Sequence, residues 1–292
     1  MNLPKRQGSP PRTYKRHAQV PRRRMYRHRG GRGLNMPFFV LFVGIFSGFF
    51  SGLLGLGGGL IMTPMFLYGP SMAGVGALTV KEITGLTMVQ GFAGAVSGLA
   101  RHRGYGMVSW RLVRYAGFAA GLSALAGAVI SKWVADGAIL AIFGAMALIA
   151  SALIFLPGSR TAQDESDPGP FSFNAPLAVI LGGAIGFAGG LVGQAGSFIM
   201  IPSMLYVLRV PTRVAIASNL GIILFSAVGG IAGKLTTAQV PIELALIMVA
   251  GSVPSAQVGA IVSRRMQPRL LRYALALVVG GAAVRIWFDV LS

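Results

Sequence analysis

The chain has 292 residues, of which 54% are hydrophobic and only 11% are charged, and it contains 42 glycines and no cysteine. An ordinary soluble domain carries charges on roughly a quarter of its residues. This composition therefore excludes a soluble globule and indicates a chain that lies largely in lipid. The lack of cysteine in the sequence excludes disulfides, thiolate metal sites and cysteine nucleophiles.

The net charge of +19 is concentrated at the start of the chain. Residues 1–33 hold 11 of the 26 Lys and Arg residues and none of the seven acidic residues. Their Arg, Pro and Gly content predicts a disordered basic N-terminal tail that attracts anionic lipid and favours a cytoplasmic start. RNA binding has little support, because Tyr14 and Tyr26 are the only aromatic residues among the basic ones. A nucleic-acid partner is therefore not expected.

Beyond residue 34 the sequence consists of apolar blocks separated by turn-like or charged residues. Each block is near or above the roughly 20 residues that cross a hydrocarbon core as a helix. The eight blocks are residues 36–68, 72–100, 112–130, 138–156, 174–208, 214–233, 242–262 and 273–291. We therefore predict an all-α fold, a polytopic transmembrane helix bundle with seven to ten crossings.

Two of the blocks are too long to be single spans. Residues 36–68 and 174–208 would form straight helices of about 50 Å, whereas the hydrocarbon core is ~30 Å thick. Each block contains a Gly-rich stretch followed by a proline, GLGGG at 55–59 and GQAGS at 193–197. We expect the helices to break at these two stretches.

The two Gly-rich stretches coincide when the chain is shifted by 138 residues. GLLGLGGGLIMTPMFLY at 52–68 then aligns with GLVGQAGSFIMIPSMLY at 190–206, with nine of 17 positions identical. A second match, offset by 132 residues, pairs AGAVISKW at 126–133 with VGAIVSRR at 258–265. The pattern predicts a bundle of two repeated halves with Gly-broken helices.

The predicted organisation has four parts. They are a disordered basic tail at 1–33, transmembrane repeat 1 at 34–157, a linker loop at 158–173 and transmembrane repeat 2 at 174–292.

The Gly-rich stretches point to transport of an anion. A helix that breaks inside a membrane leaves backbone groups unpaired, so the break must face protein or a wet cavity. The helix that resumes after each break presents free N–H groups and a partial charge of about +0.5, which suits an anion. Duplicated bundles with such breaks are typical of secondary transporters, in which the substrate lies near the membrane midplane.

Close helix packing is the alternative explanation for many of the glycines. It accounts for Gly44 with Gly48 and for Gly182 with Gly186, which have i, i+4 spacing. It accounts poorly for the glycine triplet at 57–59, because consecutive glycines weaken a helix by ~1 kcal/mol each relative to alanine. The triplet therefore favours a break.

The two Gly-rich motifs, together with GSVPSAQVGAIVSRRMQPRLLRYALALVV at 251–279, resemble the TauE/SafE family of sulfite and organosulfonate exporters. The resemblance covers most of residues 36–290 and leaves out the tail. It implies a multi-pass carrier in the bacterial inner (plasma) membrane that exports a small anion such as sulfite or sulfoacetate.

The resemblance places the family's motifs on residues 55–64 and 193–202. This chain departs from the usual second motif by carrying Gln194, Ala195 and Ser197. The second motif is therefore more polar than the glycine-rich pattern of the family.

We predict ten substrate-binding residues at the two breaks and on neighbouring blocks: Gly57, Gly58, Gly59, Gln194, Ala195, Gly196, Ser197, Lys81, Asn219 and Gln257. An unpaired charge in a membrane costs at least ~2.5 kcal/mol, so Lys81 either serves the anion or snorkels to the interface. Asn219 and Gln257 are neutral donors for an oxyanion, or alternatively hydrogen-bond between helices. Glu82 is the predicted coupling residue for a proton.

The sequence gives no sign of an enzyme. It has no acid pair within the blocks, no metal-ligand spacing and no Walker A motif, so we expect no catalysis, metal or cofactor. The expected partners are a small anionic substrate and membrane lipid, and a homo-oligomer is left open. The remaining alternative is a non-transporting membrane protein whose basic tail recruits RNA, anionic lipid or an acidic partner.

Overall fold

The computed structural model describes residues 35–54, 58–103, 108–155, 172–194 and 196–266, and five isolated positions after them, 277, 280, 281, 284 and 287. The predictions for the basic tail, for most of the linker loop and for the last apolar block fall outside these residues. Gly57 and Ala195 also lie outside them.

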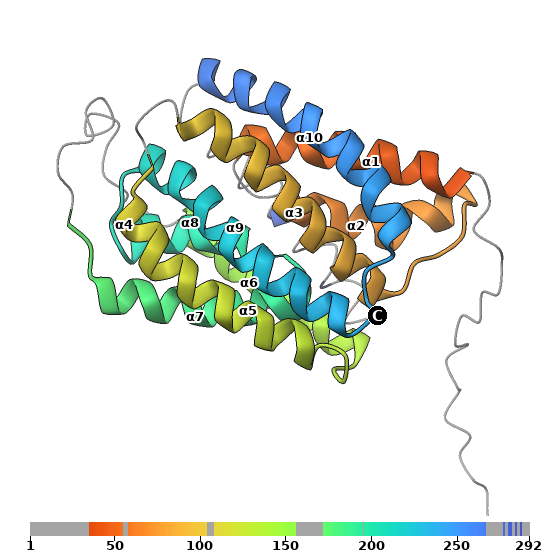
Figure 1. The fold of residues 1–292 in the computed structure, drawn as a ribbon, viewed down its shortest axis with the longest axis horizontal. Coiled ribbons are helices and arrows are strands. Elements are labelled where there is room, and N and C mark those ends of the chain that lie inside the picture. Colours follow the sequence, from red (N-terminus) through yellow and green to blue (C-terminus); the bar gives the residue numbers. More distant parts are fainter. Residues whose placement is uncertain are drawn as a thin grey trace, which may run out of the picture. The chain divides into compact units, whose positions relative to one another are not determined.

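The all-α prediction is confirmed, because every regular element in the described part of the chain is helical (Figure 1). In chain order these elements are α1 (Asn35–Leu54), α2 (Gly59–Ala73), α3 (Val80–Arg103), α4 (Trp110–Leu112), the π-helix η1 (Val113–Gly117), α5 (Phe118–Ile130), α6 (Asp136–Phe155), α7 (Ala175–Val192), α8 (Ser197–Tyr206), α9 (Thr212–Thr236) and α10 (Ile242–Arg265).

Six stretches of helix in the described residues are long and apolar enough to cross a membrane: Asn35–Leu53, Val80–Ala100, Trp110–Ile130, Ala175–Val192, Thr212–Thr236 and Ile242–Ser263. The third runs through α4, η1 and α5. The number is smaller than the seven to ten expected, because the block at 138–156 contributes only a shorter apolar stretch, Asp136–Ala150, and the last block is described at only five isolated positions. The chain is a multi-pass membrane protein.

Three glycines with positive φ mark the ends of helices at the Gly-rich stretches. Gly58 (φ +70°) is the N-cap of α2, Gly193 (φ +81°) is the C-cap of α7, and Gly196 (φ +67°) is the N-cap of α8. This left-handed conformation costs a residue with a Cβ about 1–2 kcal/mol. The helix ends therefore fall where the sequence places the breaks.

The glycines of α1 let its backbone touch α10. A Cβ added to Gly44, Gly48 or Gly52 would come within 3 Å of α10 backbone atoms, respectively those of Met248, Ser252 and Ala256. The two helices lie side by side along one edge of Figure 1. The packing explanation for Gly44 and Gly48 is confirmed.

The same arrangement recurs between α7 and α5. A Cβ on Gly182, Gly186 or Gly190 would come within 3 Å of the α5–η1 backbone, respectively that of Ala116, Ala120 and Ala124. The glycines of the two interfaces are related by the shift of 138 residues, and their partners by the offset of 132. This correspondence is what two repeated halves would produce.

Gly182 and Gly183 offer a matched pair for testing this packing. We expect Gly182→Ala to lower the unfolding free energy in detergent by about 1–3 kcal/mol, because its Cβ would meet the backbone of Ala116. Gly183→Ala on the next position has no atom within 4 Å of the added Cβ and should be neutral or stabilising. Equal losses in both variants would contradict close packing as the role of Gly182.

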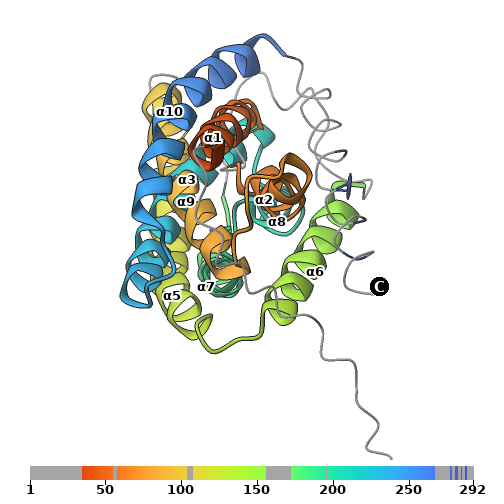
Figure 2. The ribbon, with the colours of Figure 1, turned by 90° about the vertical axis from the view of Figure 1, so that its right-hand side faces the viewer.

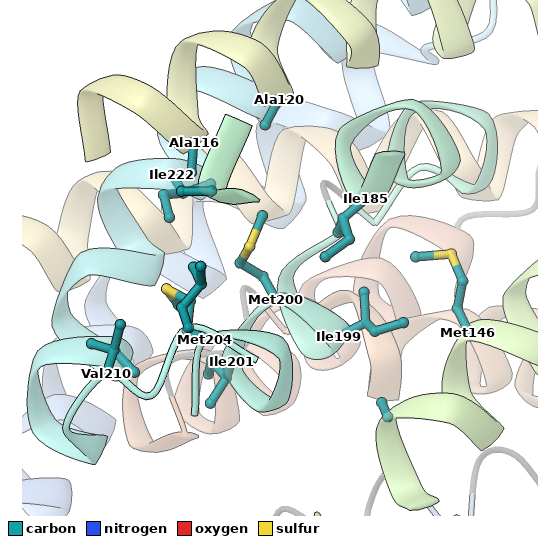
Figure 3. Close-up of a cluster of buried hydrophobic side chains, with 14 of the residues drawn as sticks. Ala116, Ala120, Met146, Ile185, Ile199, Met200, Ile201, Met204, Val210 and Ile222 are labelled. Carbon is teal, nitrogen blue, oxygen red and sulfur yellow. The ribbon is translucent and has the colours of Figure 1, made fainter. Parts of the chain in front are cut away.

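The short helices α2 and α8 are each held by apolar side chains of the longer helices. Figure 3 shows Ile199, Met200 and Met204 of α8 among residues of η1, α5, α6, α7 and α9, such as Ala116 and Ile185. Side chains of α2 pack in the same way in a second buried cluster with α1, α3 and α10. These contacts fix where the two short helices begin.

Candidate functional site

The two helix breaks meet through one side chain. Gln194 follows the end of α7, is 3% exposed, and donates from Nε2 to the carbonyl oxygen of Gly59 at 2.7 Å and to Oγ1 of Thr63. Gly59 is the first residue of α2, 135 residues away in sequence. The structure thus brings together Gly59 and Gln194, which were predicted independently as substrate-binding residues.

The second break includes two more predicted residues. Asn219 of α9 is fully buried and donates from Nδ2 to the carbonyl oxygen of Ser197, the first residue of α8, at 3.2 Å. The turn before α8 is closed by the amides of Gly193 and Gln194, both of which donate to Gly189 O. Asn219 and Ser197 therefore lie together at the start of α8, and their role in binding substrate stays a prediction.

The first break is bordered by buried polar groups that have no partner. Both amide atoms of Gln90 on α3 lack a hydrogen-bond partner although its side chain is 0% exposed, and the same holds for Oγ of Ser51 on α1. A Cβ added to Gly58 would collide with Nε2 of Gln90, and one added to Gly94 would collide with Oγ of Ser51. Gln90 therefore directs its amide at the residue that caps α2.

These groups together form a set of donors. The first N–H groups of α2 have no acceptor within their own helix, and Gln90 Nε2 is a further donor beside Gly58. The hydroxyl of Ser51 lies one turn further along α3, against Gly94, and the unpartnered oxygens of the Gln90 and Gln194 amides are acceptors in the same region. Leaving a buried donor unsatisfied costs about 1–3 kcal/mol, and such groups in native structures call for an explanation. Since no acidic side chain is buried in the described part of the chain, the arrangement suits a small anion.

The two short helices both direct their N-termini towards this region. In Figure 1 α8 lies to the left and α2 to the right, and the view of Figure 2 superimposes them. The hydrogen bond from Gln194 to Gly59 joins their starting points. Two helix N-termini close together add their partial positive charges at one place.

Three predicted residues lie elsewhere. Lys81, in the first turn of α3, donates from Nζ to the carbonyl oxygen of Lys132. Glu82 accepts hydrogen bonds from the amide and hydroxyl of Thr79 at 2.9 and 3.1 Å, and its own amide donates to that hydroxyl, which is a capping box at the start of α3. Gln257 is exposed on α10. A coupling role for Glu82 stays a prediction.

The sequence analysis missed Lys234. It is the only charged side chain among the buried residues of the described part, and it is 0% exposed. It follows directly after the apolar block 214–233, and a lysine at the end of a block is as compatible with an interfacial position as with burial. Its neighbours come from segments up to 150 residues away, which no local pattern predicts.

A bundle of apolar helices, interrupted by two paired helix starts and lined there by neutral polar groups, has the features of a membrane transporter. Residues 40–286 match the family described as Sulfite exporter TauE/SafE, and the chain belongs to this family.

Several relatives of the chain are described as probable membrane transporter proteins. The chain is 26% identical over 263 residues to the probable membrane transporter protein YunE of Bacillus subtilis, covering 84% of this chain and 95% of the relative. It is 25% identical to a probable membrane transporter protein of Methanocaldococcus jannaschii (85% and 93% covered) and 28% identical to one of Xylella fastidiosa (81% and 89% covered). No solved structure is significantly similar to the chain.

Proposed function

We propose that this membrane transporter is a secondary carrier that exports a small anion such as sulfite, sulfoacetate or another organosulfonate. The observation that carries the proposal is the unpartnered buried amide of Gln90 beside Gly58, the N-cap of α2, with the unpartnered hydroxyl of Ser51 against Gly94 as a second polar group. The description of the family as sulfite exporters supports the choice of substrate class.

The proposed anion lies near the N-termini of α2 and α8. Amide N–H groups, the Gln90 amide and the Ser51 hydroxyl are suited to the oxygen atoms of a sulfite or sulfonate group, which accept several hydrogen bonds at once. Asn219 adds a side-chain amide at the start of α8. Gly196, another predicted substrate-binding residue at the second break, would approach the anion with its backbone amide. The amide of Ser197 donates to the carbonyl oxygen of Gln194.

Alternating access requires the two halves of the bundle to move against each other around the site. Gln194, from the second half, holds Gly59 and Thr63 from the first half through hydrogen bonds. A relative movement of the halves must stretch or exchange these bonds. We therefore propose that Gln194 senses the movement that exposes the anion to one side or the other.

The proposal is tested with purified protein in proteoliposomes, as counterflow of labelled sulfite, sulfoacetate and sulfate. We expect saturable counterflow of sulfite or sulfoacetate, and the same rate in a variant that lacks residues 2–33. A protein that moves none of the three anions would contradict the proposal. Loss of flux with the tail would instead favour the alternative in which the tail is the functional part.

A further inference from the structure

The Lys234 ammonium lies in a buried cage of neutral oxygen atoms. Nζ donates to Oγ of Ser131 at 2.7 Å, to Oγ1 of Thr84 at 2.9 Å and to Oε1 of Gln239 at 2.9 Å, and it lies 3.5 Å from the carbonyl oxygen of Leu191. These partners come from α3, α7, the turn after α5 and the segment after α9. A charged side chain held inside the bundle in this way is expensive and marks a functional site by default.

The hydrogen-bond directions show that the cage binds an ammonium. Thr84 donates its hydroxyl proton to the carbonyl oxygen of Lys81 at 2.8 Å, and Ser131 donates its own to that of Ala128 at 2.6 Å. Both hydroxyls therefore turn lone pairs towards Nζ, and the amide oxygen of Gln239 is an acceptor only. Three short acceptors match the three N–H groups of a protonated lysine.

No carboxylate is among the hydrogen-bond partners of Lys234 Nζ. The titratable side chains on the segments that meet at the cage are Lys81, Glu82 and residues 101–103 on α3, Lys132 and Asp136 after α5, Arg213 on α9 and Glu243 at the start of α10. Each hydrogen-bond partner of Nζ is a neutral group. Lys81 adds a second positive charge nearby, because its Nζ donates to the carbonyl oxygen of Lys132, the residue after Ser131.

This balance makes both protonation states of Lys234 accessible. The charged state has good hydrogen bonds but carries the desolvation cost of an unpaired buried ion. The neutral state relieves that cost and loses one donor to the cage.

The cage adjoins the second helix break. Leu191 belongs to the last turn of α7, whose free carbonyl groups carry the negative end of the helix dipole. The turn that follows α7 packs against Thr84 of the same cage, because a Cβ on Gly193 would collide with the backbone of Thr84. A movement of the turn that carries Gln194 would therefore shift the positions of the oxygen atoms that surround Nζ.

Building on the proposed function, we infer that Lys234 is the residue that binds the coupling proton of transport. The proton is taken up by the amine lone pair from one aqueous side and released from Nζ to the other after the break has moved. The change of one positive charge at the C-terminal end of α7, before the second break, then alters the affinity for the anion. The predicted coupling residue Glu82 would instead serve as a helix cap.

The test compares two assays on the same proteoliposomes loaded with labelled sulfite or sulfoacetate. Counterflow without a pH gradient requires only anion exchange, whereas net accumulation under a pH gradient, imposed in each direction in turn, requires proton coupling. The variants are Lys234→Arg, which keeps a permanent charge, and Lys234→Met, which removes it. Arg213→Met, which removes an exposed charge from the same helix, and Glu82→Gln are the matched controls.

We expect the wild type, Arg213→Met and Glu82→Gln to accumulate anion under one direction of the gradient, and gradient-driven accumulation to fall at least tenfold in Lys234→Arg, while counterflow persists in that variant. Accumulation that persists in either Lys234 variant overturns the inference, as does its loss in Glu82→Gln alone. If neither variant folds, a wild-type flux that does not respond to a pH gradient in either direction overturns the inference. Wild-type protein without any counterflow contradicts the proposed function, and with it the inference that depends on it.

Discussion

Replacement of Gln90 by leucine is expected to reduce anion transport about tenfold or more without lowering the stability of the protein. A hydrogen bond to a charged group is worth about 1.5–3 kcal/mol, which corresponds to a loss of this size in affinity. Stability should hold or increase, because neither amide atom of Gln90 has a partner in the bundle and the leucine removes two buried unsatisfied groups. Counterflow and thermal unfolding in detergent check the two parts.

Gln194→Leu is the contrasting variant. Its amide also lies at the breaks, but Nε2 donates to Gly59 O and Thr63 Oγ1. We expect it to lose transport and also about 1–3 kcal/mol of stability, since the carbonyl oxygen of Gly59 loses a donor. If Gln90→Leu were as destabilised as Gln194→Leu, the Gln90 amide would have a structural partner, and its assignment to the anion would be wrong.

The second large effect is expected at Gly58. Gly58→Ala should lower the unfolding free energy by roughly 2–5 kcal/mol, combining about 1–2 kcal/mol for the left-handed backbone with about 1–3 kcal/mol for overpacking. The overpacking arises because the added Cβ would come within 3 Å of Ser47 O and of the Gln90 amide. Thermal or denaturant unfolding in detergent measures the loss.

Gly74→Ala separates the two contributions. Gly74 has nearly the same φ, +66°, at the end of α2, but no atom lies within 4 Å of its added Cβ. We expect it to lose only the backbone part, about 1–2 kcal/mol. Equal losses at Gly58 and Gly74 would mean that close approach to Gln90 adds nothing, and would argue against a tightly built first break.

The sequence was informative wherever the chain needed glycine for a geometric reason. Gly58 and Gly196 cap helices in a left-handed conformation at the places where two apolar blocks exceed the membrane thickness. Gly44 and Gly182, predicted to pack helices, lie against neighbouring backbones. These features follow from block length and from the four-residue spacing of the glycines, which are local properties of a sequence.

What the sequence could not supply was the partner of each polar residue. Gln90 follows Thr84 and Thr87 in its block, and nothing in this stretch of sequence shows that its amide is left without a partner. Lys234 is bound by oxygen atoms that lie 43 to 150 residues away, apart from Gln239. Gln257 was assigned by residue type, and its side chain is exposed.

The ligand that we propose for the helix breaks of this transporter is a small sulfur oxyanion. The concentration dependence of labelled sulfite counterflow in wild-type, Gln90→Leu and Gly183→Ala proteoliposomes tests this binding most directly. We expect saturable flux in the wild type and in Gly183→Ala, and a loss of about tenfold or more in Gln90→Leu despite normal folding. Undiminished flux in a folded Gln90→Leu protein would contradict the site, and flux of no sulfur oxyanion by the wild type would contradict the function.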